Sequence, residues 1–188
     1  AIHSQASTMA VRVDLNLPEN GYVQSGDWFG SFIRSLKEQV DAELERRKRE
    51  GRWVPDCKLG YIGVEEKVGG QQVHYHACLF LNGEIYRGLG EFPVGRGFDP
   101  DVLGDPRAER ADSLAKKIVM AWARALGMTM REAVGLVHFS EGGLYRLRRS
   151  SPGFEATEAG LFNRLSYLAK AQSKRFGRGG RNIRYSRG

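Results

Sequence analysis

Apolar and polar residues alternate along three stretches of the chain. In residues 9–17 apolar side chains occupy every second position from Met9 to Leu15, and the polar Arg12, Asp14 and Asn16 alternate with them. Side chains two residues apart share one face of an extended strand, so this pattern predicts a half-buried strand. Residues 58–67 and 72–82 form two further strand-like runs, and the Gly69-Gly70 pair between them predicts a hairpin.

Three other segments repeat their apolar residues at helical spacing. The first covers residues 27–50 and is expected to end at Gly51. The second begins after Ser113, a residue that caps helix N-termini well, and continues to Leu126 before Gly127. The third is predicted over residues 157–175, with Thr157 as its N-cap.

Two shorter runs, residues 135–140 and 144–148, flank Glu141-Gly142-Gly143 and indicate a second hairpin. Residues 83–110 are rich in Gly, Pro and Asp, which is typical of a long surface loop. Five strands with three main helices, joined partly by hairpins, predict an α+β fold with helices packed on an antiparallel sheet. We expect one domain over residues 1–188, in which 1–8 are flexible or an artificial addition and 174–188 form a basic tail.

Composition narrows the possible partners. The chain has 188 residues, of which 41% are hydrophobic and 27% charged, values that suit a soluble globular protein. Its net charge of +7 favours a polyanionic partner such as nucleic acid. No apolar stretch is long enough to span a bilayer and no secretory signal is visible, so we expect a cytoplasmic protein that does not bind membranes. Cys57 and Cys78 are expected to be reduced thiols.

The strand at 72–82 carries the first candidate for chemistry. His74 and His76 are two residues apart and therefore share a face, while the other face is apolar. Two neighbouring imidazoles can bind one divalent ion. A two-residue turn at Gly69-Gly70 would place Glu65 opposite His74 as a third ligand and Glu66 on the apolar face; a turn of odd length would exchange the two glutamates. The alternative is a pair of ordinary surface histidines.

The last predicted helix carries the second candidate. Tyr167 and Lys170 are three residues apart and lie on one helical face. A tyrosine oxygen can attack phosphorus and form a phosphotyrosine, and a neighbouring ammonium group favours the phenolate. Alternatively, Tyr167 is a core aromatic residue and Lys170 extends past it towards solvent.

Taken together, these motifs resemble those of the HUH endonucleases, in which an acidic residue, a His-hydrophobe-His strand and a later Tyr-x-x-Lys helix follow in this order. The strand at 11–15 resembles the first, structural motif of the same enzymes. A closer resemblance is to the inovirus-type replication initiators, which include the YagK/YfjJ-type domain. This likeness spans roughly residues 10–188 and rests on three segments, residues 74–82, 135–139 and 164–170.

The resemblance implies a five-stranded antiparallel sheet with the HUH strand at its centre. It implies a catalytic Tyr167 assisted by Lys170, and a Mn or Mg ion held by His74, His76 and Glu65. Such an enzyme nicks single-stranded DNA at an origin hairpin, remains joined to the 5′ phosphate and initiates rolling-circle replication of a phage or mobile element. A host helicase or polymerase is a candidate partner. Since no second tyrosine stands one turn from Tyr167, how the second strand transfer is completed is left open.

Basic residues near the C-terminus are candidates for contacts with DNA phosphates. A relaxase or transposase with the same chemistry is one alternative function, and a non-catalytic single-stranded nucleic-acid-binding module on an RNA-recognition-like sheet is another. A covalent adduct with DNA separates the enzyme from the module. The expected phosphate contacts are Arg146, Arg148, Arg149, Lys174, Arg175, Arg178, Arg181 and Arg184.

Overall fold

The computed structural model describes residues 5–18, 26–68, 72–90, 112–173 and 183–186, without the side chains of 67, 68, 72 and 168–173. The chain divides into two compact units that interleave in sequence. Unit 1 comprises Ala1–Asp14, Asp56–Arg87 and Ser140–Gly188, and unit 2 comprises Leu15–Pro55 and Gly88–Phe139.

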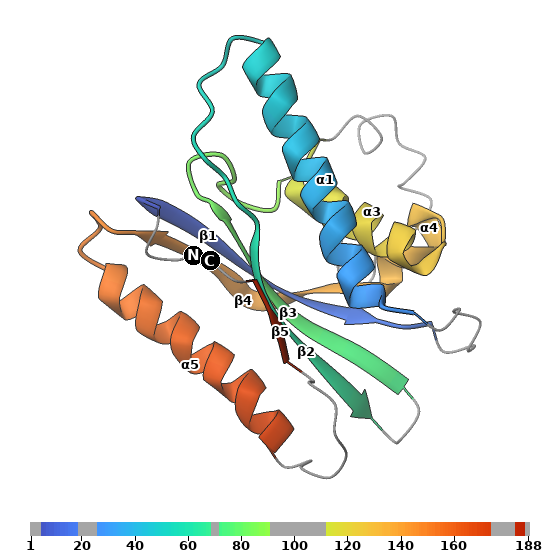
Figure 1. The fold of residues 1–188 in the computed structure, drawn as a ribbon. Coiled ribbons are helices and arrows are strands. Elements are labelled where there is room, and N and C mark those ends of the chain that lie inside the picture. Colours follow the sequence, from blue (N-terminus) through green and yellow to red (C-terminus); the bar gives the residue numbers. More distant parts are fainter. Residues whose placement is uncertain (1–4, 19–25, 69–71, 91–111, 174–182, 187–188) are drawn as a thin grey trace. The chain divides into compact units, whose positions relative to one another are not determined.

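The strands form one five-stranded antiparallel sheet in the order β4-β1-β3-β2-β5 (Figure 1). The α+β class is therefore confirmed, and the histidine-bearing strand β3 is the central one, as predicted. β1 begins two residues earlier than expected and includes Ser7 and Thr8, both buried, from the segment that we expected to be flexible. The strands are β1 (Ser7–Asn16), β2 (Gly60–Val68), β3 (Gln72–Asn82), β4 (Val137–Arg148) and β5 (Ile183–Tyr185).

The register of the β2–β3 hairpin differs from the predicted one. Val68 pairs with Gln72, so three residues rather than two separate the paired ends. Glu66 consequently stands opposite His74, and Glu65 stands opposite the buried Tyr75. The prediction that Glu65 shares the histidine face is wrong, because a change of one residue in the turn moves every side chain of β2 to the other face.

β4 is one continuous strand instead of the predicted second hairpin. Gly142 adopts a φ of 61°, a left-handed conformation that favours glycine over residues with a side chain. Tyr145 and Leu147 pack on one face of the sheet. Strict alternation would turn Ser140 to the other face, yet its hydroxyl donates to Asp14 on the same face, so the alternation shifts by one residue near Gly142. An extra residue in a strand produces this shift in the manner of a β-bulge. The fifth strand is β5, which lies in the segment predicted as a basic tail.

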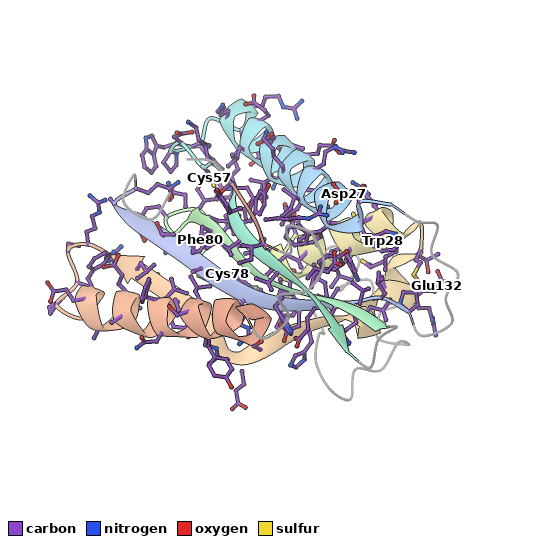
Figure 2. The ribbon with its side chains drawn as sticks, turned by 60° about the horizontal axis from the view of Figure 1, so that its bottom comes forward. Asp27, Trp28, Cys57, Cys78, Phe80 and Glu132 are labelled. Carbon is purple, nitrogen blue, oxygen red and sulfur yellow. The ribbon has the colours of Figure 1, made fainter. Side chains whose placement is uncertain are left out.

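Helix α5 (Phe154–Ser173) covers one face of the sheet in unit 1 (Figure 1). It begins three residues before the predicted N-cap, and the Thr157 hydroxyl instead donates to the carbonyl of Gly153. Figure 2 shows Cys78 and Phe80 on β3, where they belong to the core beneath this helix. That core consists of Ala10, Cys78, Phe80, Leu147 and Leu161, with Ile62, Tyr145, Phe154 and Leu165 packed against it.

Two predicted helices form most of unit 2. Asp27 caps α1 (Trp28–Arg49), as Figure 2 shows at the start of this helix, and Ser113 caps α3 (Leu114–Leu126). The first and last residues of both helices agree with the predicted ones to within one residue. Phe32 and Trp122 join the helices edge to face, with ring centroids 5.9 Å apart.

A short helix, α4 (Met130–Ala133), which was not predicted, follows α3 in unit 2. A capping box between Thr129 and Glu132 fixes its start, and the 3₁₀ turn η3 (Val134–Leu136) connects it to β4. Across the part of the chain that the structure describes, no helix is both long and apolar enough to cross a membrane.

Candidate metal centre and nucleophile

The imidazole of His76 lies between two carboxylates on the face of the sheet that α5 covers. Its Nδ1 is 2.6 Å from Oδ1 of Asp14 on β1, and its Nε2 is 2.8 Å from Oε2 of Glu66 on β2. The hydroxyl of Ser140 on β4 donates to the other oxygen of Asp14 at 3.2 Å. Residues from four neighbouring strands therefore meet at one position, and all of them belong to unit 1.

This cluster is only partly shielded from solvent. The side chains of Asp14 and His76 are 19% and 23% exposed, and that of Glu66 is 37% exposed. The cluster is thus open on the side of Glu66, where a solute can reach the contact between the imidazole and the carboxylate.

Electrostatics favour a protonated imidazole in this arrangement. The hydrogen bond to Asp14 raises the pKa of His76 above its usual value; burial opposes this effect, and the charge of Asp14 and the contact with Glu66 reinforce it. Burial alone would raise the pKa of Asp14, but the hydrogen bond and charge of His76, with Arg12 and Ser140, hold that pKa below its usual value. A divalent cation at Nε2 would replace one proton on the imidazole.

The pair formed by His76 and Glu66 fits a divalent cation. Two ligand atoms at roughly 2.1 Å from an ion, and at right angles to each other, lie about 3 Å apart. The separation of 2.8 Å between Nε2 and Oε2 is close to that value. His74 is directly opposite Glu66 and shares the face of His76. Within the described residues, however, no three His, Cys, Asp or Glu side chains converge as a metal site, so the fit covers two ligands, with His74 as the candidate third.

The predicted nucleophile is on α5 but faces outward. Leu161 and Leu165 of this helix pack against the sheet. At 3.6 residues per turn, Tyr167 is rotated by roughly 120° from the first and roughly 160° from the second. Its side chain is accordingly 74% exposed. The backbone of Lys170 continues the helix, and its side chain lies outside the described residues.

The predicted DNA-binding arginines do not share the face of His76. Tyr145 and Leu147 occupy the α5 face of β4, so the exposed Arg146 and Arg148 alternate onto the opposite face. Arg184 pairs with Gly63, whose neighbours in β2 point to the α5 face, and thus also lies on the opposite face. Arg148 is 3.4 Å from Glu84, and the exposed Arg149 follows the end of β4. Lys174, Arg175, Arg178 and Arg181 lie outside the described residues.

Sequence reasoning missed Asp14, Glu66 and Ser140 as parts of this cluster. Asp14 occupies a polar position of an alternating strand, but only the order of the strands reveals that β1 borders β3. Ser140 reaches the cluster only because of the bulge at Gly142. Glu66 was recognisable as the outcome of an odd turn, which the Gly69-Gly70 pair alone does not specify.

Comparisons with known proteins identify similar sequences. The sequence model of the family called YagK/YfjJ C-terminal domain matches residues 1–186 of this chain. The uncharacterized protein YagK of Escherichia coli (strain K12) is 33% identical over 186 residues, which cover 93% of this chain and 81% of YagK. The uncharacterized protein YfjJ of the same organism is 28% identical over 200 residues, which cover 100% of this chain and 88% of YfjJ. No solved structure matches the chain.

Proposed function

We propose that this chain, which belongs to the YagK/YfjJ C-terminal domain family, is a metal-dependent endonuclease of the HUH type that nicks single-stranded DNA through Tyr167. One observation carries the proposal: Asp14 holds Nδ1 of His76, while Nε2 and a Glu66 oxygen approach each other on the open side of the cluster. A carboxylate on one imidazole nitrogen is the usual support for a histidine that binds a metal through the other.

Each residue of the cluster has a role in this proposal. Asp14 accepts the proton of Nδ1, which fixes the ring orientation and leaves the Nε2 lone pair as a ligand. His76 and Glu66 would hold a Mn or Mg ion, with His74 as a third ligand. The bound ion would supply Lewis acidity at a phosphate oxygen. Glu66 takes the place that we first assigned to Glu65, because the observed register puts Glu66 on the histidine face.

The covalent step belongs to Tyr167. Its phenolic oxygen forms a bond to the phosphorus of the scissile phosphodiester, and the bond from phosphorus to the 3′ oxygen breaks. The phenolic proton is released, and the leaving oxygen takes up a proton to become a free 3′ hydroxyl. Tyr167 is exposed and faces away from the sheet in this structure, so the reaction requires α5 to turn until the phosphate lies between Tyr167 and the pair formed by His76 and Glu66. The free 3′ hydroxyl would prime rolling-circle replication.

The direct test is adduct formation between the full chain and labelled single-stranded DNA from its own replication-origin region, in the presence of Mn and on a denaturing gel. We expect a covalent adduct with the native chain and none with Tyr167→Phe, which removes a single oxygen. Tyr185→Phe is the matched control, since Tyr185 is also exposed and belongs to unit 1. An adduct that persists in Tyr167→Phe would contradict the assignment of the nucleophile.

Two adjacent glutamates provide a sharper test of the metal ligands. Glu66→Gln and Glu65→Gln make the same chemical change at neighbouring positions on opposite faces of β2. We expect the first to lower the rate of adduct formation by roughly tenfold or more, and the second to leave it unchanged. Equal loss in both variants would remove the register argument from the proposal.

The position of Tyr167 favours one rival function, a non-catalytic module that binds single-stranded nucleic acid. The side chain lies on the outer side of α5, and its ring is available for stacking with a base as well as for chemistry. Retention of DNA by the native chain, with Mn present and without any adduct on origin DNA of either strand, would favour this module over the nuclease.

A further inference from the structure

Two arginines that none of the assigned roles uses lie on the face of the sheet that bears His76. Arg12 is two residues before Asp14 on β1, and its Nη2 is 3.5 Å from an Asp14 oxygen. Arg164 is on α5 beside Leu165, and its Nη2 donates to the backbone carbonyl of Glu141 at 3.0 Å. Arg12 therefore belongs to the sheet and Arg164 to the helix that covers this face.

At the bulge of β4, the side chains of Arg12 and Arg164 lie near two adjacent glycines, Gly143 and Gly142. A Cβ atom added at Gly143 would lie 3.2 Å from Cβ of Arg12, and one added at Gly142 would lie 3.9 Å from Nη1 of Arg164. Gly143 also has no room for a side chain, because the added atom would lie 2.7 Å from the carbonyl oxygen of Ser140. The glycine at position 143 thus lets Arg12 lie close against the backbone next to Ser140, while Arg164 lies at ordinary contact distance from the neighbouring Gly142.

Neither arginine has its hydrogen-bonding capacity satisfied. The Nε atoms of Arg12 and Arg164 are both buried without a hydrogen-bond partner among the described residues. A buried donor without an acceptor destabilises the fold, because it has lost its hydrogen bonds to water. Nε and Nη together form the fork with which a guanidinium group binds two oxygens of a phosphate. A phosphate would supply the acceptors that the protein does not provide, once the side chains extend from their buried positions.

We propose that Arg12 and Arg164 grip a backbone phosphate of single-stranded DNA beside the pair formed by His76 and Glu66. This inference rests on the proposed function and names the residues that position its substrate. Arg146, Arg148 and Arg184 lie on the other face of the sheet, so a strand lying over His76 meets Arg12 and Arg164 instead. The grip holds the phosphodiester chain without reading its bases.

The test measures binding without cleavage. The full chain is titrated against labelled oligothymidylate with no divalent ion present, over a series of salt concentrations. Arg164→Gln should weaken binding about tenfold and reduce the slope of log Kd against log salt by about 0.7, the value for one phosphate contact on a single strand. Arg164→Lys keeps the charge and loses the fork, so it should retain the slope and weaken binding about threefold. Arg34→Gln, at an exposed arginine of α1 to which no DNA contact is assigned, is the control and should leave both quantities unchanged.

Arg12→Gln is expected to have the same effect as Arg164→Gln, and thermal unfolding of each variant shows whether the fold is retained. Because Arg12 pairs with Asp14 of the cluster itself, Arg164 carries the test if Arg12→Gln does not fold. An unchanged affinity and slope in Arg164→Gln would overturn the grip, as would an equal loss in Arg34→Gln.

The outcome for the grip is independent of the nicking assay. Adduct formation in the presence of Mn together with normal binding by Arg164→Gln would remove the grip and leave the nuclease standing. Weakened binding by Arg164→Gln in a chain that forms no adduct would remove the nuclease and leave a phosphate-binding surface.

Discussion

Each unit of the chain holds a basic side chain between two carboxylates, yet the two clusters differ in how they meet solvent. In unit 2, Lys117 on α3 contacts Glu43 at 3.3 Å and also forms an ion pair with Asp112. The side chains of Lys117 and Glu43 are only 9% and 4% exposed, whereas that of Asp112 is 48% exposed. In unit 1, the side chain of His76 is 23% exposed and that of Glu66 is 37% exposed.

The two clusters also differ in how completely their charges are compensated. Arg47 donates to Glu43 at 2.8 Å, and Arg46 donates to Asp112 at 2.7 Å, so each carboxylate around Lys117 has a second cation. Around His76, Asp14 has a second cation in Arg12, and the contact that the structure gives Glu66 is the imidazole itself.

The difference separates a structural cluster from a candidate site. A buried and neutralised ion pair such as that of Lys117 and Glu43 costs a great deal to break, because removing one member leaves an uncompensated buried charge. An open cluster with an exposed carboxylate loses less when a member is removed, and it can exchange a proton for a cation. Functional sites commonly combine moderate stability with such accessible, perturbed groups.

The largest expected effect is on stability, after removal of each central cation. Lys117→Ala should lower the free energy of unfolding by about 3 kcal/mol, because Glu43 stays buried with one partner fewer. His76→Ala should lower it by about 1 kcal/mol, since Glu66 turns to water and Asp14 keeps Arg12 and Ser140. Urea unfolding measures both values. Equal losses would show that the two clusters are not different in kind.

The second prediction uses metal binding to distinguish the clusters. Adding Mn at about 100 times its dissociation constant should raise the free energy of unfolding by about 2.7 kcal/mol, because the ion binds the folded chain alone. This gain should be lost in Glu66→Gln and retained in Glu65→Gln and in Lys117→Ala. Calorimetric unfolding with Mn, and with EDTA as the control, measures it. A gain that survives Glu66→Gln would place the ion elsewhere.

The third prediction compares one glycine from each unit. Gly142 in β4 and Gly127 at the end of α3 have φ values of 61° and 68°. Replacing either by alanine should cost about 1 kcal/mol, the penalty for an L-residue in the left-handed region. Only Gly142→Ala should also weaken binding of oligothymidylate, because its bulge orders Ser140 and the backbone that Arg164 contacts. Weaker DNA binding by Gly127→Ala would indicate a general effect of destabilisation.

How far the sequence predicted this structure depended on the range of the interactions involved. The ends of α1 and α3 were predictable because their signals, Asp27 with Gly51 and Ser113 with Gly127, act within one turn of the helix. The histidine strand was predictable because its alternating pattern is local. Where the alternation of apolar and polar residues breaks at a glycine, the sequence does not distinguish a turn from a bulge. The residues of β4 were therefore predicted as two strands of a hairpin.

The candidate site was less predictable than the fold. His76 was found from its own strand, whereas its two carboxylate partners depend on pairing between strands. The choice between Glu65 and Glu66 depended on one residue in the connection between β2 and β3, and the contact with Asp14 depended on β1 lying next to β3. Tyr167 faces away from the sheet because Leu161 and Leu165 of the same helix are buried against it. Which residues of α5 are buried depends on its packing against the sheet and not on the helix alone.

The smallest expected effect concerns the effect of acid on Asp112, the exposed member of the cluster around Lys117. Burial alone would raise the pKa of Asp112, but the hydrogen bond and charge of Lys117, with those of Arg46, hold that pKa below its usual value. The folded chain therefore binds this proton less tightly than the unfolded chain does. The stabilisation is complete above the usual aspartate pKa of about 4 and is lost as pH falls through the lower, folded value. Because the Asp112 side chain is 48% exposed, solvent screening limits the effect to about 0.5 kcal/mol.

Asp112→Asn should therefore lower the free energy of unfolding by that amount at neutral pH, and the difference from the native chain should shrink in acid. Urea unfolding across this pH range measures the difference, and a difference that stays constant with pH would mean that Asp112 acts through packing and not through its charge.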